Sequence, residues 1–374
     1  MQTKHLSEAI GLFAIALLER NKMFKTGIVK DHRYLEHITG NYHPESHHRL
    51  EAIYSMLEDD DIKGRFIDIK PRFATRMELE YVHSKEYISQ VALTDGKPMV
   101  MLDGDTQTSP KSWQAAQLAA GGFLELIDRL MAKDIDNGFA FVRPPGHHAE
   151  HDRGMGFCIF NNVAIGAKYA ITKYHLEKIL IVDWDLHHGN ATQHTFYDNP
   201  KVLYFSTHQF PYYPGTGSFG ETGVGLGQGY TINVPLNPGQ GDEEYAKIFL
   251  EILKPVALEF KPELILVSSG FDTYFKDPLG GMHVTPYGFA KMTKIILELA
   301  NRVCEGKALF ILEGGYNLDG LKNSVKAVLL ELIGDSDLFK DKLFLDEHIE
   351  SPNLDSILTK VKTHHQNYWK TLSL

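Results

Sequence analysis

Short apolar runs recur along the chain, and longer stretches with helical periodicity separate most of them. The runs are rich in β-branched and aromatic side chains, as buried strands are. They lie at residues 26–29, 138–142, 178–182, 201–205, 230–234, 263–267 and 308–312. Helices are expected at residues 113–131, 161–174, 242–260, 286–303, 318–333 and 355–369, and one more is expected to start at Pro44. Strands that alternate with helices predict an α/β protein, in which helices cover both faces of a parallel sheet.

The composition fits one large domain preceded by a short extension. The chain has 374 residues, of which 43% are hydrophobic and 23% are charged. These fractions are ordinary for a globular protein with a large core, and α/β enzymes of this length often remain one domain. No linker, internal repeat or low-complexity segment interrupts the chain. We expect residues 26–374 to form a single domain and residues 1–25 to form an N-terminal helical extension.

The extension contains an apolar run at residues 10–18. This run is too short to span a bilayer, and it lacks the basic residues and the cleavage site of a secretory signal, so no membrane association is predicted. Residues 5–22 are expected to form an amphipathic helix. That helix either packs on the domain or makes a partner contact, for instance in a homo-oligomer.

Charge and cysteine content narrow the function classes. The formal net charge of −10 argues against binding to a phosphate backbone, and no basic run marks a nucleic-acid surface. An acidic protein can attract cationic substrates such as lysine-bearing peptides or polyamines, although the charge can equally serve solubility alone. The two cysteines, Cys158 and Cys304, predict no disulfide framework, so a reducing, cytoplasmic location is the default.

Polar side chains follow four of the predicted strands, at the point where each strand ends. They are His147 and His148 after strand 138–142, the segment 183–190 after strand 178–182, Asp272 after strand 263–267, and Tyr316 after strand 308–312. Ligands of parallel α/β sheets bind at the carboxyl ends of the strands. Four such loops that converge on one edge of a sheet therefore indicate a single functional site.

Asp185, His187 and Asp272 form the predicted metal site. Asp185 and His187 are two residues apart, so their side chains leave an extended backbone on the same side. With Asp272 they make three ligands and leave a position open, which is the pattern of catalytic zinc. Two carboxylates with one imidazole are harder ligands than a typical zinc set, so Fe²⁺ stays an alternative. Taken alone, Asp272 is slightly better interpreted as a capping or paired carboxylate, and only its company with the other two residues favours a ligand.

His147 and His148 follow a Pro-Pro-Gly turn that holds the pair stiffly. A neutral imidazole can accept a proton from an attacking water, and an imidazolium can give one to a leaving amine. Asp183 is a candidate to orient one ring through its N–H, and Asn190 can orient the other without adding a charge. The sequence does not decide which histidine is the general base.

Aromatic side chains surround the predicted site. Tyr316 follows two glycines, and its phenol can donate a hydrogen bond to the oxyanion of a tetrahedral intermediate. Phe157, Tyr212 and Tyr213 lie on flanking loops, where aromatic walls suit a slender aliphatic substrate. Ordinary packing explains each of these aromatic residues about equally well when it is taken singly.

Seven short motifs occur in order between residues 43 and 316. They are His-Pro-Glu at 43–45, Arg-Pro-Pro-Gly-His-His-Ala at 143–149, Gly-Phe-Cys at 156–158, Asp-Trp-Asp-Leu-His-His-Gly-Asn at 183–190, Pro-Gly-Thr-Gly at 214–217, Gly-Phe-Asp at 270–272 and Glu-Gly-Gly-Tyr at 313–316. From about Thr26 to Gly334 the chain resembles the zinc-dependent histone deacetylase family. Within it, the chain looks most like the class II-like members and the bacterial histone deacetylase-like amidohydrolases.

The resemblance implies the arginase/deacetylase fold, with a central parallel sheet of about eight strands, and it makes residues 26–374 the catalytic domain. It implies zinc ligation by Asp185, His187 and Asp272. It implies proton transfer by His147 and His148, and oxyanion stabilisation by Tyr316. For the substrate, it implies a tunnel lined by Phe157 and Tyr213, and a carbonyl at Gly156 that accepts the substrate amide N–H.

The resemblance also implies structural potassium ions. The first site would use Asp183, the backbone carbonyls of Asp185 and His187, and Ser206. A second and looser site would lie near Phe196, Asn199, Val202 and Tyr230.

Three positions bear on activity and specificity within the family. Asn190 follows the class II pattern, where class I members carry Asp. Tyr316 predicts catalytic competence, since relatives with His at this position act weakly on acetyl-lysine. Leu279 stands where polyamine-specific relatives carry a gatekeeping Glu, so its apolar side chain disfavours a polyamine substrate.

We therefore expect a zinc-dependent hydrolase that removes acetyl or longer acyl groups from the side-chain amine of lysine in peptides or proteins. The first alternative is a small-molecule deacylase of the acetylpolyamine type. A non-catalytic protein that binds acyl-lysine is the second, and the intact ligand set and Tyr316 speak against it. Arginase-type hydrolysis requires a second metal and ligand motifs richer in Asp than this sequence contains.

Overall fold

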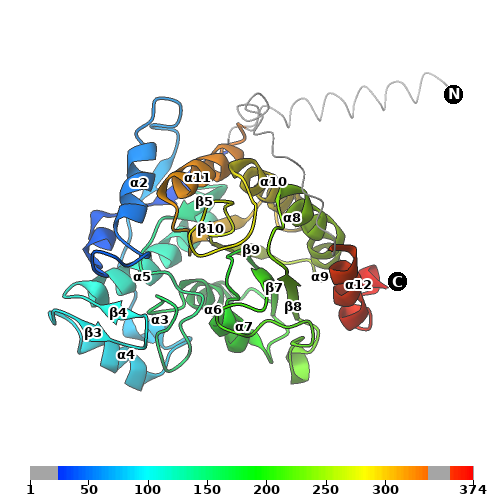
Figure 1. The fold of residues 1–374 in the computed structure, drawn as a ribbon, viewed down its shortest axis with the longest axis horizontal. Helices are drawn as coiled ribbons and strands as arrows, with labels where there is room; N and C mark the ends of the chain where they lie inside the picture. Colours follow the sequence, from blue (N-terminus) through cyan, green and yellow to red (C-terminus); the bar gives the residue numbers. More distant parts are fainter. Residues whose placement is uncertain (1–23, 336–353, 374) are drawn as a thin grey trace.

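A computed structural model describes residues 24–335 and 354–373, with an eight-stranded sheet at the centre (Figure 1). The strands are β1 (Thr26–Val29), β2 (Ile67–Ile69), β5 (Asn137–Ala140), β6 (Ile179–Asp183), β7 (Val202–Gln209), β8 (Thr231–Leu236), β9 (Leu264–Ser269) and β10 (Ala308–Leu312). Their order is β2-β1-β5-β10-β9-β6-β7-β8, and every neighbouring pair is parallel. The predicted α/β class and parallel sheet are confirmed.

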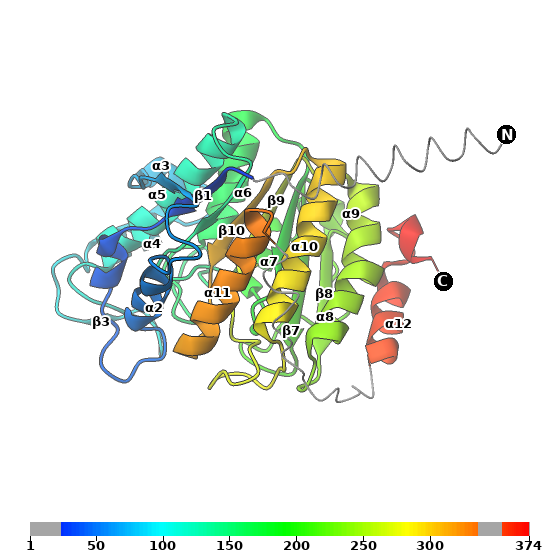
Figure 2. The ribbon, with the colours of Figure 1, turned by 90° about the horizontal axis from the view of Figure 1, so that it is seen from above.

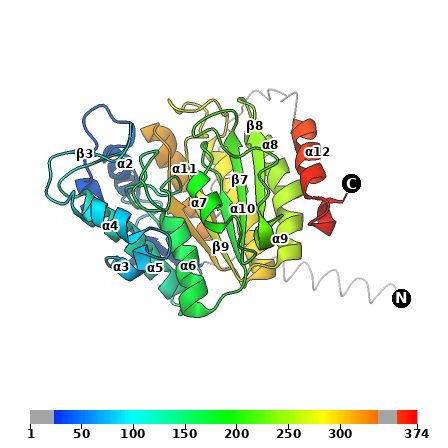
Figure 3. The ribbon, with the colours of Figure 1, turned by 90° about the horizontal axis from the view of Figure 1, so that it is seen from below.

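Helices cover both faces of this sheet. They are α2 (His48–Met56), α3 (Arg76–Leu79), α4 (Lys85–Ala92), α5 (Ser112–Met131), α6 (Asn162–Tyr174), α7 (Asn190–Phe196), α8 (Asp242–Ile248), α9 (Lys254–Phe260), α10 (Pro286–Val303), α11 (Leu318–Leu332) and α12 (Leu354–His365). Figure 2 shows α2 and α8 to α11 on one face, and Figure 3 shows α3 to α7 on the other. The central strands are buried along their whole length because both faces are covered, which explains their continuous apolar sequences.

Side chains at the end of strand β6 point alternately toward the hydrophobic core and toward the polar site. Trp184, directly after the strand, is fully buried, and its ring lies 5.8 Å from that of Phe310 and 6.3 Å from that of Phe289 in α10. Its neighbours lie on the opposite side of the backbone, where Asp183 accepts a hydrogen bond from His147 and Asp185 accepts one from the backbone N–H of His187. The extended backbone therefore directs alternate residues of one segment to the core and to the site.

Several elements differ from the sequence prediction. Helix α2 starts at His48 rather than at Pro44. The predicted helix 242–260 consists of α8 and α9 joined by a π-helical turn at Phe249–Leu253. Strand β2, helices α3 and α4 and the two-stranded sheet of β3 (Val100–Met101) and β4 (Gln107–Thr108) were not predicted. These elements have two to eight residues, too few to produce a clear hydrophobic period.

The predicted N-terminal helix at residues 5–22, and any partner contact through it, lie outside the described residues. Within residues 24–335 and 354–373, no helix is long and apolar enough to cross a membrane.

Candidate active site

Four adjacent strands deliver the predicted site residues to one edge of the sheet. The strands β5, β10, β9 and β6 are consecutive in the sheet order. The loops that follow them carry His147 and His148, Tyr316, Asp272, and the segment 183–190. Parallel strands end at the same edge, so these loops meet, as the sequence predicts.

Asp185, His187 and Asp272 come together in a buried cluster whose ligand atoms all lie within 4.8 Å of one another. The Nδ1 atom of His187 lies 3.2 Å from Oδ1 of Asp185 and 3.0 Å from Oδ2 of Asp272. Backbone N–H groups hold both carboxylates, since Leu186 donates to Asp272 at 2.9 Å and Gly314 donates to Asp185 at 2.8 Å. The cluster is therefore preorganised by the loops themselves.

The charges in this cluster favour a cation. Burial and the neighbouring Asp185 raise the pKa of Asp272 to about 7. At His187, burial lowers the pKa, but the bonds to Asp185 and Asp272 outweigh it and raise the pKa to about 10. The two buried carboxylates together carry more negative charge than one imidazole can balance. A divalent ion bound between them would supply the positive charge that is needed. The donor set of two carboxylates and one imidazole fits zinc.

His147 and His148 lie beside this cluster, and each has the orienting partner that the sequence predicts. His147 Nδ1 donates to Oδ2 of Asp183 at 3.1 Å, and His148 Nδ1 donates to Oδ1 of Asn190 at 2.7 Å. Burial lowers the pKa of both imidazoles, but Asp185 and Asp183 reverse the effect at His147 and raise its pKa to about 10. The pKa of His148 stays well below its usual value. The pKa values of the two neighbours therefore shift in opposite directions.

Tyr316 is positioned by the loop after β10. Its backbone N–H donates to Oδ2 of Asp277 at 2.7 Å, and the preceding Gly315 has φ = 114°, a conformation that favours glycine. The guanidinium of Arg49 lies 5.1 Å from the centre of the Tyr316 ring and donates to the carbonyl of Gly315 at 2.7 Å. Burial raises the pKa of Tyr316, so its phenol stays a hydrogen-bond donor.

Comparison with known proteins identifies the family. A model of the histone deacetylase domain matches residues 43–332. A probable deacetylase of Archaeoglobus fulgidus is 38% identical over 357 residues, which cover 92% of this chain and 99% of that protein. The crystal structure of the HDA15 HD domain matches with a TM-score of 0.86 at 37% identity, and the match covers 94% of this chain and 97% of that one. The chain belongs to the histone deacetylase family.

Two longer relatives carry the same domain. Histone deacetylase 5 of Arabidopsis thaliana is 39% identical over 342 residues, which cover 85% of this chain and 50% of that protein. Histone deacetylase 9 of Homo sapiens is 37% identical over 374 residues, which cover 90% of this chain and 36% of that protein. The chain thus spans half or less of these two proteins. Zinc-dependent hydrolysis is general in the histone deacetylase family, and the resemblance predicted from the motifs is confirmed.

Aromatic side chains pack around the candidate metal ligands and the histidine pair of this deacetylase domain. The Phe157 ring lies 4.6 Å from that of His43 and 5.9 Å from that of Tyr316. The Tyr213 ring lies 5.2 Å from that of His148, and Tyr212 stacks on His187 at 5.6 Å. Tyr212 and Tyr213 remain 40% and 37% exposed, so they lie between solvent and the buried ligands.

Gly156 and Leu279 flank these rings. Gly156 has φ = 57°, and a Cβ atom there would approach the His148 ring to 2.5 Å, so the loop needs glycine. The half-buried Leu279 accepts a hydrogen bond through its backbone carbonyl from the Tyr212 hydroxyl at 2.9 Å. Its side chain adds no charge to this rim.

The residues of the predicted potassium sites fall in two places. Asp183 and Ser206 are paired in register between β6 and β7, and Asp183 accepts from the Tyr204 hydroxyl at 3.0 Å. The other set is Phe196, Asn199, Val202 and Tyr230, which lie around the start of β7. Ion binding at either place stays a prediction.

Sequence reasoning missed Glu150 and Glu313. Glu150 Oε1 accepts from Asn190 Nδ2 at 2.5 Å and from His194 Nδ1 at 2.8 Å, so a hydrogen-bonded chain runs from His148 to a half-exposed histidine. Glu313 Oε2 accepts from the backbone N–H groups of Gly146 at 2.7 Å and His147 at 3.2 Å. Burial raises the pKa of Glu313 to about 7. Only the closeness of Glu150 to the histidine pair in the sequence could have pointed to it.

A buried charge network behind the Tyr316 loop was also missed. The Glu45 carboxylate accepts from Arg143 Nε at 2.5 Å and from Arg49 at 3.0 Å, and all three side chains are fully buried. Because an unpaired buried charge is costly, the three groups hold one another in place. Arg49 thereby links α2 to the loop that carries Tyr316.

Proposed function

We propose that the protein hydrolyses the amide that joins an acetyl or longer acyl group to the side-chain amine of lysine in a peptide or protein. The observation that carries this proposal is the convergence of Asp185, His187 and Asp272 with two histidines whose partners differ. Its relatives include a probable deacetylase and several histone deacetylases, which favours this substrate class over acylated polyamines and over mere acyl-lysine binding.

Asp185, His187 and Asp272 would hold the metal ion, which polarises the amide carbonyl and lowers the pKa of the attacking water. His148 accepts the proton of that water, because its low pKa keeps the imidazole neutral. Tyr316 donates a hydrogen bond to the carbonyl oxygen as negative charge develops there. The C–N bond then breaks, and the His148 imidazolium protonates the leaving amine. His147, held by Asp183, stabilises the negative charge of the transition state from the other side of the pair.

Four further residues position the substrate in this proposal. Phe157 and Tyr213 flank the aliphatic arm of acyl-lysine, and the carbonyl of Gly156 accepts the N–H of the scissile amide. Leu279 provides an uncharged rim, which suits a peptide better than a polyamine.

Further parts of the proposal concern ions, compartment and domain extent. Zinc is the expected metal and Fe²⁺ the alternative, because two of the three ligands are carboxylates. Structural potassium is proposed at Asp183 and Ser206, and more loosely around Asn199. A reducing, cytoplasmic location is supported by Cys158 and Cys304, which are both free and buried. We assign the catalytic domain to residues 26–374.

The test is hydrolysis of acetyl-, trifluoroacetyl- and long-acyl-lysine peptides by metal-stripped protein, with and without added Zn²⁺. Release of acetate that depends on zinc supports the proposal. Turnover of only the longer or activated acyl groups retains the mechanism and changes the acyl group. Acetylated polyamines are the comparison substrate. Their preferential hydrolysis, or no turnover by folded zinc-loaded protein, would contradict the proposed substrate class.

A further inference from the structure

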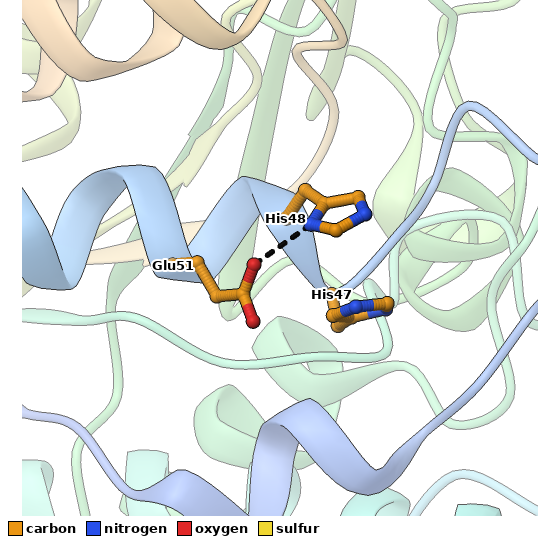
Figure 4. A group of neighbouring side chains, drawn as sticks. All are labelled: His47, His48 and Glu51. Carbon is orange, nitrogen blue, oxygen red and sulfur yellow. Dashed lines mark hydrogen bonds and ion pairs between the residues drawn. The ribbon is translucent and has the colours of Figure 1, made fainter. Parts of the chain in front are cut away.

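The start of α2 carries a further group of side chains that could hold a metal ion, separate from the active site. His47, His48 and Glu51 present two imidazoles and one carboxylate, whose ligand atoms all lie within 4.8 Å of one another. Glu51 follows the histidines by four and three residues, spacings that bring side chains together on one helix face. Figure 4 shows the three side chains at one end of α2, where the dashed line joins His48 Nδ1 to Glu51 Oε2 at 2.7 Å.

Helix formation does not explain the two histidines. His47 occupies the N-cap, where Ser, Thr, Asp or Asn usually accepts a bond from the first-turn N–H groups. Its side chain makes no capping bond. A neutral imidazole is the form that binds metals. The helix dipole opposes a bound cation at this end, and Glu51 supplies the negative charge that offsets this.

The backbone under the cluster is held firmly, whereas the side chains can adjust. Arg49 directly follows His48 in the helix. Its side chain is fully buried and donates to the carbonyls of Gly315 at 2.7 Å and Glu313 at 2.5 Å. The side chains of His48 and Glu51 are 59% and 49% exposed. Zinc ligands at about 2.1 Å from the ion are roughly 3.4 Å apart in a tetrahedral site. Side-chain rotations are therefore enough to close the cluster, whose His47 and His48 rings already lie 4.1 Å apart.

We infer that His47, His48 and Glu51 form a second metal site, which binds a divalent transition-metal ion such as Zn²⁺, Ni²⁺ or Cu²⁺ and leaves positions open for water. Imidazole suits these ions, whereas Mg²⁺ and Ca²⁺ prefer oxygen ligands. None of the three residues belongs to the active-site cluster, so this inference does not rest on the proposed function.

Counting bound zinc tests the inference. Full-length metal-stripped protein is equilibrated with Zn²⁺ and dialysed, and the metal is measured by elemental analysis. We expect two ions per wild-type chain and one per chain of the double variant His47→Asn/His48→Asn. The matched control is His175→Asn, an exposed histidine with φ = 56°, a conformation that Asn adopts readily. The control should retain two ions. Equal zinc contents of the wild type and the double variant would overturn the inference.

Spectroscopy identifies the ligands directly. Cu²⁺ bound to the wild type beyond the first equivalent should show nitrogen hyperfine coupling in its electron paramagnetic resonance spectrum, and the double variant should lose this signal. Persistence of the signal in the double variant would place the second ion elsewhere. The double variant should hydrolyse acetyl-lysine peptide at the wild-type rate. If the wild type binds two ions but hydrolyses no substrate, the proposed function fails and the second site stands.

Discussion

His147 and His148 are neighbours in the sequence, and their rings lie 4.0 Å apart, yet their electrostatic surroundings differ. His147 donates to the carboxylate of Asp183, whereas His148 donates to the amide of Asn190. Burial lowers the pKa of both, but only His147 faces enough negative charge for its pKa to rise, to about 10. The comparison teaches that neighbouring charges separate two equally buried imidazoles, because Asp185 and Asp183 raise the pKa of His147, whereas His147 and His187 lower the pKa of His148 beyond the effect of burial.

Replacing His148, the imidazole with the lowered pKa, should have the largest effect on activity. We expect His148→Ala to lower kcat by roughly 10²- to 10⁴-fold, because the attacking water loses its proton acceptor. The measurement is steady-state hydrolysis of acetyl-lysine peptide. Circular dichroism and zinc content serve as controls, and both should match the wild type. A folded, zinc-loaded variant with normal turnover would contradict the assignment of His148 as general base.

Giving His148 a charged partner should make the two histidines more alike. In Asn190→Asp, the new carboxylate stabilises the imidazolium and raises the pKa of His148, by about one unit or more. Since the neutral imidazole is the active form, activity falls as pH drops through this pKa. The acidic limb of the kcat/KM profile should therefore move to higher pH. An unchanged limb would show that a different group controls it.

Removing the support behind Asn190 should have a smaller effect. Glu150 accepts from Nδ2 of Asn190 and so turns Oδ1 of that amide toward His148. We expect Glu150→Ala to lower kcat by roughly tenfold with little change in KM, the usual scale for the loss of such a supporting bond. Glu150→Gln retains an acceptor and should recover part of the rate. Equal losses in kcat for both variants would count against this positioning role.

Replacing His194, at the outer end of this series of hydrogen bonds, should have the smallest effect on kcat. His194 pairs with Glu150 at 2.8 Å, but its side chain is 49% exposed, so solvent and salt screen the pair. We expect His194→Gln to change kcat by less than about twofold at 0.15 M salt. Rate measurements at low and high ionic strength check this. A tenfold loss would mean that the His194 side chain matters as much to the rate as the Glu150 carboxylate does.

Much of the site could be predicted from the sequence. The spacing of Asp185 and His187 and the strand ends that carry Asp272 and the histidine pair are local features, and they led to three candidate ligands that lie together in the structure. The orienting partners of the histidine pair were predicted too. Glu150 was missed because its direction depends on the fold of the loop after the histidines. Arg49 was missed because it contacts carbonyls more than 260 residues away in the sequence.

By itself the sequence determined the alternation of strands and helices, the candidate ligands and the family, because hydrophobic period, residue spacing and motifs are local properties. Only the tertiary structure decided that β5, β10, β9 and β6 are adjacent, which brings four separate loops to one edge. It alone decided the buried network of Glu45 with two arginines and the opposite pKa shifts of His147 and His148. These depend on contacts between distant segments and on exclusion of water, and neither is encoded in any short stretch of the chain.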